Sequence, residues 1–394
     1  MRRDDPVHFA THEDYPDFWH ITKHADIFDI ERRTEDFLNA PRVLIATLDH
    51  ENAIRVQTGG ETVRIRTLLS YDAPTHMQLR LLTQSWFMPK NLDKLSGRIS
   101  ESVDNSMDVL MQSDGDIDFA RDVALEYPLR VIMAVLGIKE QDYGLMLRLT
   151  QELFGPEDPD IGRKVEDGVD AQAALAQTVA DLFAYFRAFT EEKVANPKDD
   201  VGTIIANAEI DGTRLDEVGR LGYYIIVATA GHDTTSYSLS EAVHQLARDP
   251  ALFDRLKDSP NDTAPLITEE AIRYATPVRH FIRTANKDTQ VGDKTIREGQ
   301  SVILWYPSGS RDEDVFADPH SFNIDRDRST RHASFGHGAH MCLGMHLARM
   351  ELNLFLKALA QNVESIELRD EPKYVQANFV GGIKSLPARI SMKR

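Results

Sequence analysis

The run 334–344, SFGHGAHMCLG, holds the residues with the clearest capacity for chemistry, and an expected helix over 345–359 follows it. Gly336, Gly338 and Gly344 let the backbone approach a bound group and direct N–H donors at one atom. Cys342 lies just before the expected helix N-terminus, so these donors and the helix dipole would stabilise a thiolate there. Such a thiolate suits a metal ligand or a nucleophile.

The residue types alone leave more than one kind of site open at Cys342. One is a zinc site that combines Cys342 with His337, His340 or His346, and another is a Cys–His nucleophile. Neither matches a familiar ligand spacing well. A lone cysteine is most often a small buried hydrophobe, but the three glycines around this one disfavour that interpretation.

The charge around the cysteine run is opposite to that of the whole chain. Lys and Arg number 45 against 63 Asp and Glu, which gives a formal net charge of −18. Residues 328–349 contain no Asp or Glu but hold four histidines together with Arg328, Arg331 and Arg349. This local surplus predicts an anionic partner, whereas the overall charge argues against nucleic acid and anionic membrane surfaces.

A second candidate for chemistry lies in a helical pattern over 215–248. Its apolar middle, Tyr223–Ala230, runs directly into the sequence GHDTTS. Glycine inside a helix costs about 1 kcal/mol relative to alanine, and burying an unpaired Asp costs several more. Ala230 and Gly231 would leave room for a ligand against the helix, while Asp233 and Thr234 could distort the hydrogen-bond ladder and relay protons.

A third feature is the pair Glu270 and Arg273, which are spaced i, i+3 in a helical segment that ends before Pro277. On an exposed helix face such a pair contributes only about 0.2–0.5 kcal/mol. By itself the pair therefore indicates no function.

The elements that must position these groups are mostly helices. Helical periodicity covers much of 74–275, including 79–87, 125–136 and 145–154. A short strand at 18–21 and a helix over 23–33 precede this part, and short strands over 290–296, 301–306 and 388–392 follow it. We expect a mostly α fold with a smaller β region (α+β), in which strands from both ends of the chain join one domain over 1–394.

Composition limits the class of protein. The chain has 394 residues, of which 42% are hydrophobic, so it can bury a large core and is not disordered. With one cysteine it forms no intrachain disulfide, which suits a reducing compartment. No stretch offers roughly 18 apolar residues without charge. We expect a cytoplasmic monomer.

In this order, the three features together resemble the cytochrome P450 haem-thiolate monooxygenases, and the resemblance covers essentially the whole chain. The pattern F-x-x-G-x-x-x-C-x-G, from Phe335 to Gly344, is similar to the cysteine loop of that family. The sequence AGHDTT, from Ala230 to Thr235, is similar to its oxygen-activating helix motif, and Glu270 and Arg273 are similar to its structural pair.

The resemblance implies the cytochrome P450 fold and haem b (iron protoporphyrin IX) as cofactor, with Cys342 as the thiolate ligand of the iron. Asp233 and Thr234 would deliver protons to oxygen. His76, Arg80, Arg283 and His340 would bind the haem propionates. Residues implied to contact the cofactor are His76, Arg80, Ala230, Gly231, Arg283, Phe335, Gly336, His340, Cys342 and Gly344.

The resemblance is closest to the bacterial branch that hydroxylates α-terpineol, on segments such as YPLRVIM (127–133) and NFVGGIK (378–384). It implies O₂-dependent hydroxylation of a small hydrophobic molecule, a monoterpenoid or an aromatic hydrocarbon, with electrons from an iron–sulfur ferredoxin. Arg349 and its basic neighbours would dock that ferredoxin. Specificity would depend on the segments 49–70 and 154–173, both expected to be loop-like. The implied substrate pocket comprises Ile226, Thr229, Ala230, Val278, Phe281, Phe379 and Val380.

Two departures from the family pattern matter. The first expected strand lies close to Met1, whereas the resemblance implies a helix before that strand, so Met1 need not be the natural start. Ser321 stands where many relatives have an arginine that completes the network of Glu270 and Arg273. Two other functions stay open as alternatives: a zinc-dependent hydrolase built on Cys342, and a haem-thiolate sensor or carrier without turnover.

Overall fold

The computed structural model describes residues 1–156, 158–164 and 171–393. The helices are α1 (His24–Arg32), α2 (Leu48–Thr58), α3 (Thr75–Gln84), α4 (Pro89–Leu92), α5 (Ser96–Gln112), α6 (Glu126–Leu136), α7 (Tyr143–Phe154), α8 (Ala171–Ala195), α9 (Val201–Ala206), α10 (Glu217–Ala230), α11 (Asp233–Arg248), α12 (Pro250–Asp258), α13 (Pro260–Ala275), α14 (Tyr306–Gly309) and α15 (Met345–Asn362). The strands are β1 (Val7–His12), β2 (Tyr15–Ile21), β3 (Phe37–Leu38), β4 (Asp116–Asp118), β5 (Glu209–Ile210), β6 (Thr213–Arg214), β7 (His280–Ala285), β8 (Thr289–Val291), β9 (Lys294–Ile296), β10 (Ser301–Trp305), β11 (Val363–Leu368), β12 (Lys373–Tyr374), β13 (Ile383–Ser385) and β14 (Pro387–Met392). The predicted α+β class is confirmed.

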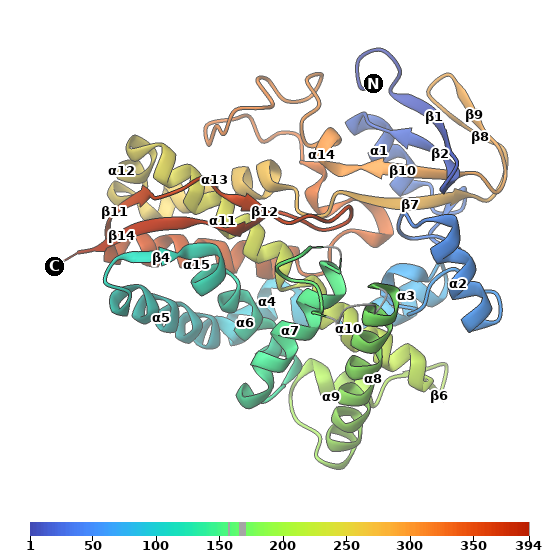
Figure 1. The fold of residues 1–394 in the computed structure, drawn as a ribbon, viewed down its shortest axis with the longest axis horizontal. Helices are drawn as coiled ribbons and strands as arrows, with labels where there is room; N and C mark the ends of the chain where they lie inside the picture. Colours follow the sequence, from blue (N-terminus) through green and yellow to red (C-terminus); the bar gives the residue numbers. More distant parts are fainter. Residues whose placement is uncertain (157, 165–170, 394) are drawn as a thin grey trace.

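Strands from the two ends of the chain meet in one sheet, as predicted. Its order is β1-β2-β10-β7-β3. Strand β10 pairs in parallel with β2, with Ser301 opposite Phe18, and antiparallel with β7, with Ser301 opposite Thr284. Ile21 and Ile303 in this sheet are fully buried. Figure 1 shows the sheet on one side of the molecule, while most helices fill the other side.

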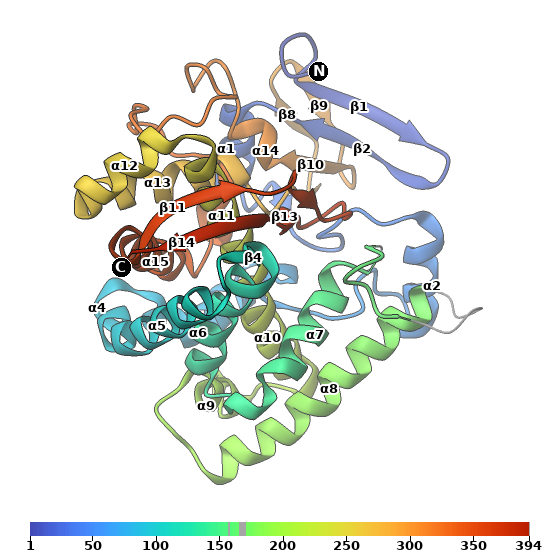
Figure 2. The same ribbon diagram turned by 60° about the vertical axis from the view of Figure 1, so that its left-hand side comes forward.

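The helical body packs around α11. Almost every residue of this helix is buried, including its serines and Glu241, which is the pattern of a helix surrounded by others. Helices α13 and α15 pack against it and against each other. In Figure 2, α8 runs along the outer edge of the body, far from the sheet of β11 and β14. The cavity described below lies where this body meets the large sheet.

The helix predicted over 215–248 is interrupted. Helix α10 ends at Ala230 and α11 begins at Asp233, with a turn at Gly231 and His232. The hydroxyl of Thr234 donates to the carbonyl of Ala230 at 2.8 Å. A side-chain donor thus satisfies a carbonyl at the end of α10, and the predicted distortion of the ladder lies at the expected residues.

The prediction of a loop over 49–70 is wrong for its first half, which forms α2. The side chain of Thr47 caps this helix by accepting from the N–H of His50, and Gly59 ends it with φ of 76°. Weak apolar periodicity hid a helix that is set by its caps. Within the other predicted specificity segment, 154–173, residues 157 and 165–170 lie outside the described residues.

Candidate active site

A cavity of about 670 Å³ lies between α10, α11, β7 and the loop that carries Cys342. Most of the candidate site residues line it, although they come from parts of the chain more than 250 residues apart. Those lining it are His76, Arg80, Ile226, Thr229, Ala230, Gly231, Thr234, Val278, Phe281, Arg283, Phe335, Gly336, His340, Cys342, Gly344, Phe379 and Val380. Asp233, Glu270 and Arg273 are not among the residues that line the cavity.

The cysteine loop has the conformation that its glycines suggest. Gly336 and Gly338 have φ of 64° and 67°, and a side chain on Gly338 would collide with the backbone carbonyl of Glu31. Glycine at 338 therefore allows the loop to lie directly on α1. The N–H of Cys342 donates to the carbonyl of Phe335 at 2.8 Å, which holds the cysteine three residues before the first residue of α15.

Two opposed effects act on the thiol of Cys342. Burial raises the pKa of the thiol, while the backbone N–H of Gly344, Arg80 and Arg349 lower it. In the protein without metal, burial is the larger of these effects on the pKa of the thiol. Coordination to a metal ion would remove the proton. The neighbouring donors would then stabilise the ligated thiolate.

Cationic and imidazole side chains gather at one end of the cavity. The rings of His76 and His340 stack at a centroid distance of 3.7 Å, and Asn39 contacts His340 at 3.3 Å. Burial, then nearby Arg80, lower the pKa of His76 to about 4, and burial, then Arg283, lower that of His340 to about 2. Both histidines are therefore neutral in this protein at pH 7.

Arg80 shows why an anion fits this end of the cavity. Burial lowers the pKa of its guanidinium, and no carboxylate of the described part of the chain forms an ion pair with it. A half-buried cation without a carboxylate partner is costly, and an anion would offset that cost. The haem implied by the sequence would bring two carboxylates to such a cluster, and Cys342 lies in the same cavity. The residues present therefore fit the group.

The turn between α10 and α11 brings small residues to the cavity wall. Ala230, Gly231 and Thr234 line the cavity. A Cβ on Gly231 would come within 3.0 Å of Ile132, so the close packing behind this turn favours glycine. Thr234 lines the cavity, and its hydroxyl, which donates to the carbonyl of Ala230, could accept a hydrogen bond from a small ligand there or turn to donate one.

Asp233 is buried instead of facing solvent. Its side chain is 1% exposed, and neither carboxylate oxygen has a hydrogen-bond partner among the residues described. Burial raises the pKa of Asp233, although His232, whose Nδ1 lies 3.4 Å from Oδ1, opposes that shift. Asp233 is thus placed behind the wall formed by Thr234, as a buried group able to hold a proton.

The pair Glu270 and Arg273 forms the centre of a buried network below the cysteine loop. All five N–H groups of Arg273 donate: two to Glu270 at 2.7 and 2.8 Å, and three to the carbonyls of Ser310, Pro319 and Ser321. The sequence-based interpretation of an isolated helix-face pair understates this role. The network belongs to the fold that supports the loop.

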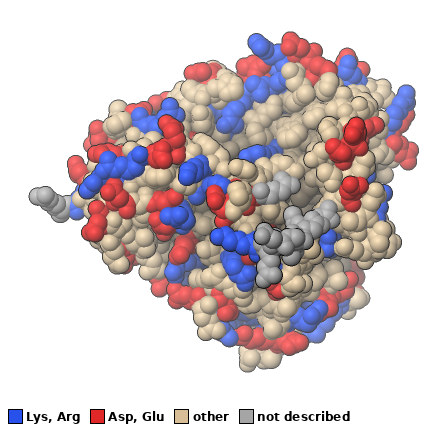
Figure 3. Space-filling view, in the orientation of Figure 1, with Lys and Arg blue, Asp and Glu red and all other residues tan. Residues whose placement is uncertain are grey.

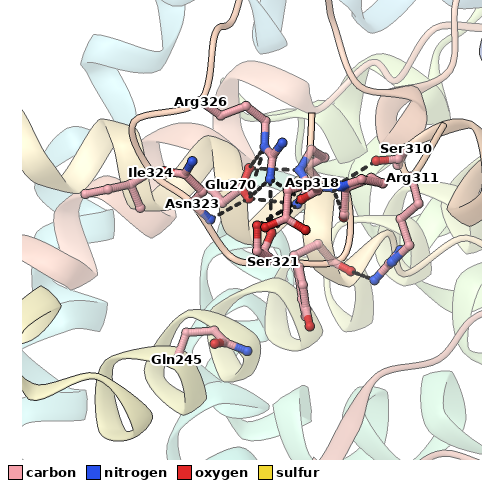
Figure 4. Close-up of polar contacts among 12 residues, drawn as sticks. Gln245, Glu270, Ser310, Arg311, Asp318, Ser321, Asn323, Ile324 and Arg326 are labelled. Carbon is pink, nitrogen blue, oxygen red and sulfur yellow. Dashed lines mark hydrogen bonds and ion pairs between the residues drawn. The ribbon is translucent and has the colours of Figure 1, made fainter. Parts of the chain in front are cut away.

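The doubt raised by Ser321 is answered by Arg326. Figure 4 shows Arg326 and Asn323 joined to Glu270. The guanidinium of Arg326 lies 3.4 Å from the carboxylate of Glu270 and donates to the carbonyl of Ser321 at 3.1 Å. Arg326 stands five residues after Ser321, so a search for an arginine at position 321 alone does not find it. The buried carboxylate in need of a second cation was the available signal.

Arg349 is less free than the local charge suggested. Its guanidinium forms an ion pair with Glu269 and lies over the ring of Phe335, 4.6 Å from the ring centroid. Burial raises the pKa of Glu269, but His332 and Arg349 lower it to about 2. Acidic and basic side chains are intermixed on the face seen in Figure 3, around a hollow with mostly uncharged walls.

The sequence missed residues on both sides of the cavity. Glu31 and Tyr306 line the same end as Arg283, and Leu153, Phe154 and Val179 extend its apolar wall from α7 and α8.

Among the described residues, no group of three His, Cys, Asp or Glu could hold a metal ion, so Cys342 has no zinc-site partners there. No helix in that part of the chain is long and apolar enough to span a membrane.

Known proteins resemble this chain along almost its full length. The sequence model of the Cytochrome P450 family matches residues 265–392. Cytochrome P450-terp from a Pseudomonas species is 40% identical, over 99% of this chain and 92% of the relative. Linalool 8-monooxygenase from Pseudomonas putida is 29% identical, over 98% of this chain and 93% of the relative.

Solved structures agree with the sequence relatives. CYP108D1 from Novosphingobium aromaticivorans superposes with a TM-score of 0.91 at 40% identity, and covers 100% of this chain and 92% of its own. CYP268A2 from Mycobacterium marinum, in complex with pseudoionone, has a TM-score of 0.88 at 29% identity, over 98% of this chain and 92% of its own. The fold expected from the cysteine loop and the α10–α11 motif is confirmed.

Proposed function

Since this chain belongs to the cytochrome P450 family and is a haem-containing monooxygenase, we propose that it hydroxylates a small hydrophobic molecule of the terpenoid or aromatic hydrocarbon class. We further propose haem b as the cofactor, Cys342 as its thiolate ligand, and an iron–sulfur ferredoxin as the electron donor. The single cysteine suits a cytoplasmic enzyme. The chain would act as a monomer.

One observation carries the substrate proposal. The cavity that holds Cys342 and Thr234 is also lined by a wall of apolar side chains. Ile226, Val278, Phe281 and Val380 belong to this wall. Apolar walls with few polar groups bind uncharged hydrophobic ligands. Two relatives, Linalool 8-monooxygenase and CYP268A2 in complex with pseudoionone, agree with a ligand of that class.

The haem, when bound, would supply oxygen activation, and the residues of the chain would supply position and protons. His76, Arg80, Arg283 and His340 would hold the propionates. The Thr234 hydroxyl would present a proton at the cavity wall, and the buried carboxyl of Asp233 would supply the next one. The apolar wall would exclude water and hold the substrate close to the oxidising centre.

Electrons would enter on the side of the cysteine loop. The basic residues of 328–349 favour an acidic ferredoxin by electrostatic steering. Because Arg349 is paired with Glu269, we place more weight on Arg331, which is exposed. Reduction by the ferredoxin should slow as ionic strength rises, and Arg331→Glu should slow it further. A rate insensitive to both changes would contradict this docking site.

A binding and turnover experiment tests the whole proposal. The haem-loaded protein is titrated with linalool, α-terpineol and p-cymene while its Soret band is followed, and product is then measured with a ferredoxin, its reductase and NADH. We expect spectral binding, and one hydroxylated product per NADH for the best ligand. Cys342→Ala should lose the thiolate-type Soret band of the reduced carbonyl complex.

Each failure has a distinct meaning. Haem and ligand binding without substrate-dependent NADH consumption would indicate a haem-thiolate sensor or carrier. A thiolate-type band that survives in Cys342→Ala would exclude Cys342 as the ligand. Preferential binding of charged or long-chain ligands would contradict the substrate class.

A further inference from the structure

Glu31 is a buried carboxyl group whose role the proposed function does not explain. It lies on α1 with 4% of its surface exposed and lines the cavity at the end that contains Arg283. Gly336 and Gly338 of the cysteine loop pack directly on it and on its carbonyl. A carboxyl group at this position faces the same space in which two haem propionates would have to bind.

The contacts of Glu31 are few and specific. The hydroxyl of Tyr306 donates to Oε1 at 2.7 Å, and the guanidinium of Arg283 lies 3.6 Å from the same oxygen. The other oxygen, Oε2, has no hydrogen-bond partner within the described ranges. One carboxylate oxygen is therefore bound, and the other is buried without compensation.

The charges around Glu31 come from three elements. Burial raises the pKa of Glu31 to about 7. Arg283 on β7, Tyr306 on α14 and, least of all, the backbone of His337 lower it. The ring of His337 stacks on Phe28, 4.7 Å away. Arg283 is the only cation in contact with Glu31 among the residues described. Around Arg283 itself lie His76, His340 and Arg80.

Arg283 therefore has two possible anionic partners. In the structure it faces Glu31, and in the loaded enzyme it would also face a haem propionate. Two carboxylates beside one guanidinium cannot both stay ionised at low cost, because the second negative charge lacks a partner in a buried site. The added anion would raise the proton affinity of Glu31 further.

We propose that Glu31 carries a proton in the haem-loaded enzyme at neutral pH, leaves Arg283 to the propionate, and makes the haem reduction potential depend on pH. The proposal relies on haem binding as stated under the proposed function. Above neutral pH, where Glu31 is ionised in the oxidised enzyme, it takes one proton from solvent and becomes neutral when the haem iron gains one electron from the redox partner. On oxidation the electron and the proton both leave, so charge and atoms balance.

The direction of the effect follows from charge. An ionised Glu31 adds a negative charge near the haem and stabilises the oxidised iron, so the potential falls as pH rises. The steepest possible fall is about 59 mV per pH unit, the value for one proton taken up with one electron. We expect the slope to develop above about pH 7, where a carboxyl group with so raised a pKa would titrate.

The test measures the midpoint potential of the holoenzyme against pH by spectroelectrochemical titration. Glu31→Gln keeps the shape and the acceptor for Tyr306 but cannot ionise. It should keep its haem and its thiolate-type spectrum, and its potential should be nearly constant with pH. The matched control is Asp29→Asn on the same helix, at a side chain that is about half exposed. It should keep the wild-type slope.

Tyr306→Phe provides a second variant. It removes the hydrogen bond that stabilises ionised Glu31, so the sloping region should move to higher pH while the slope is retained. This shift would not follow from a merely structural role of Glu31. It also keeps the proposal testable if Glu31→Gln folds poorly.

The outcomes separate this inference from the proposed function. A wild-type potential independent of pH would mean that no proton accompanies reduction, and an equal slope in Glu31→Gln would assign the proton to another group. Either result would overturn the inference while leaving the hydroxylase intact. A sloping region that stays at the same pH in Tyr306→Phe would also contradict the inference. A purified chain that takes up no haem would overturn both.

Discussion

Replacing Arg273 by lysine should destabilise the protein well beyond the effect of an ordinary charge-conserving substitution. Arg273 is 2% exposed and donates five hydrogen bonds, to both oxygens of Glu270 and to three carbonyls. Lysine has three N–H donors, so at least two of these five buried hydrogen bonds are lost. Each unsatisfied buried group costs about 1–3 kcal/mol.

The expected loss is therefore about 2–6 kcal/mol, which is a large part of the stability of an ordinary protein. The loss of these hydrogen bonds should also destabilise the cysteine loop. The hydroxyl of Ser310, whose carbonyl binds Arg273, accepts from the N–H of Ala333 at 3.2 Å. Ala333 begins the turn that leads into the cysteine loop, so the variant should release haem at lower urea concentration.

The assay is a urea titration of the holoenzyme, followed by far-UV circular dichroism and by the Soret band. The matched control is Arg255→Lys, because Arg255 also binds a carboxylate through two N–H groups, at 2.6 and 2.7 Å from Asp325, but in solvent. Such a pair contributes at most about 1 kcal/mol. Equal midpoint shifts in the two variants would refute the argument from buried acceptors.

Three further predictions address the site itself. Thr234→Ala should keep haem and oxygen consumption but divert reducing equivalents to peroxide, whereas Thr234→Ser should not; an unchanged product yield per NADH would remove Thr234 from the proton route. Gly338→Ala should lower haem retention in urea far more than Gly299→Ala, because both have positive φ but only Gly338 packs against the backbone of α1; equal losses would mean that the φ angle alone matters. The pKa of Glu269 is lowered from 4.5 to about 2, so its contribution to stability is present above pH 4.5 and is lost as pH falls toward 2. Glu269→Gln should flatten that acid loss in thermal unfolding measured against pH, and an unchanged profile would contradict the ion pair with Arg349.

Residues that act through local backbone geometry could be predicted from the sequence. The cysteine loop needs glycines at fixed positions, and two of them have the positive φ angles that glycine favours. The break between α10 and α11 falls at Gly231 and His232 because small and hydroxyl residues there compete with the helix ladder. Such requirements involve neighbours a few residues apart, so one sequence reveals them.

Partners brought together across the fold could not be predicted in this way. Arg326 replaces the arginine missing at 321, and Arg349 is paired with Glu269. Helix α2 depends on its caps more than on periodicity. No local pattern specifies which distant carboxylate a given arginine will meet, because that choice is made by packing.

By itself, the sequence determined the chemistry available to this protein: one thiol in a glycine loop, an acid and an alcohol at a helix break, and too few cysteines for a disulfide. Only the tertiary structure decided the surroundings of those groups. Among the described residues, it buried Asp233 without a hydrogen-bond partner, left Arg80 without a carboxylate, and placed Glu31 beside Arg283. The physical reason is that burial and charge pairing depend on every element around a group, whereas backbone conformation depends mainly on the residue and its neighbours.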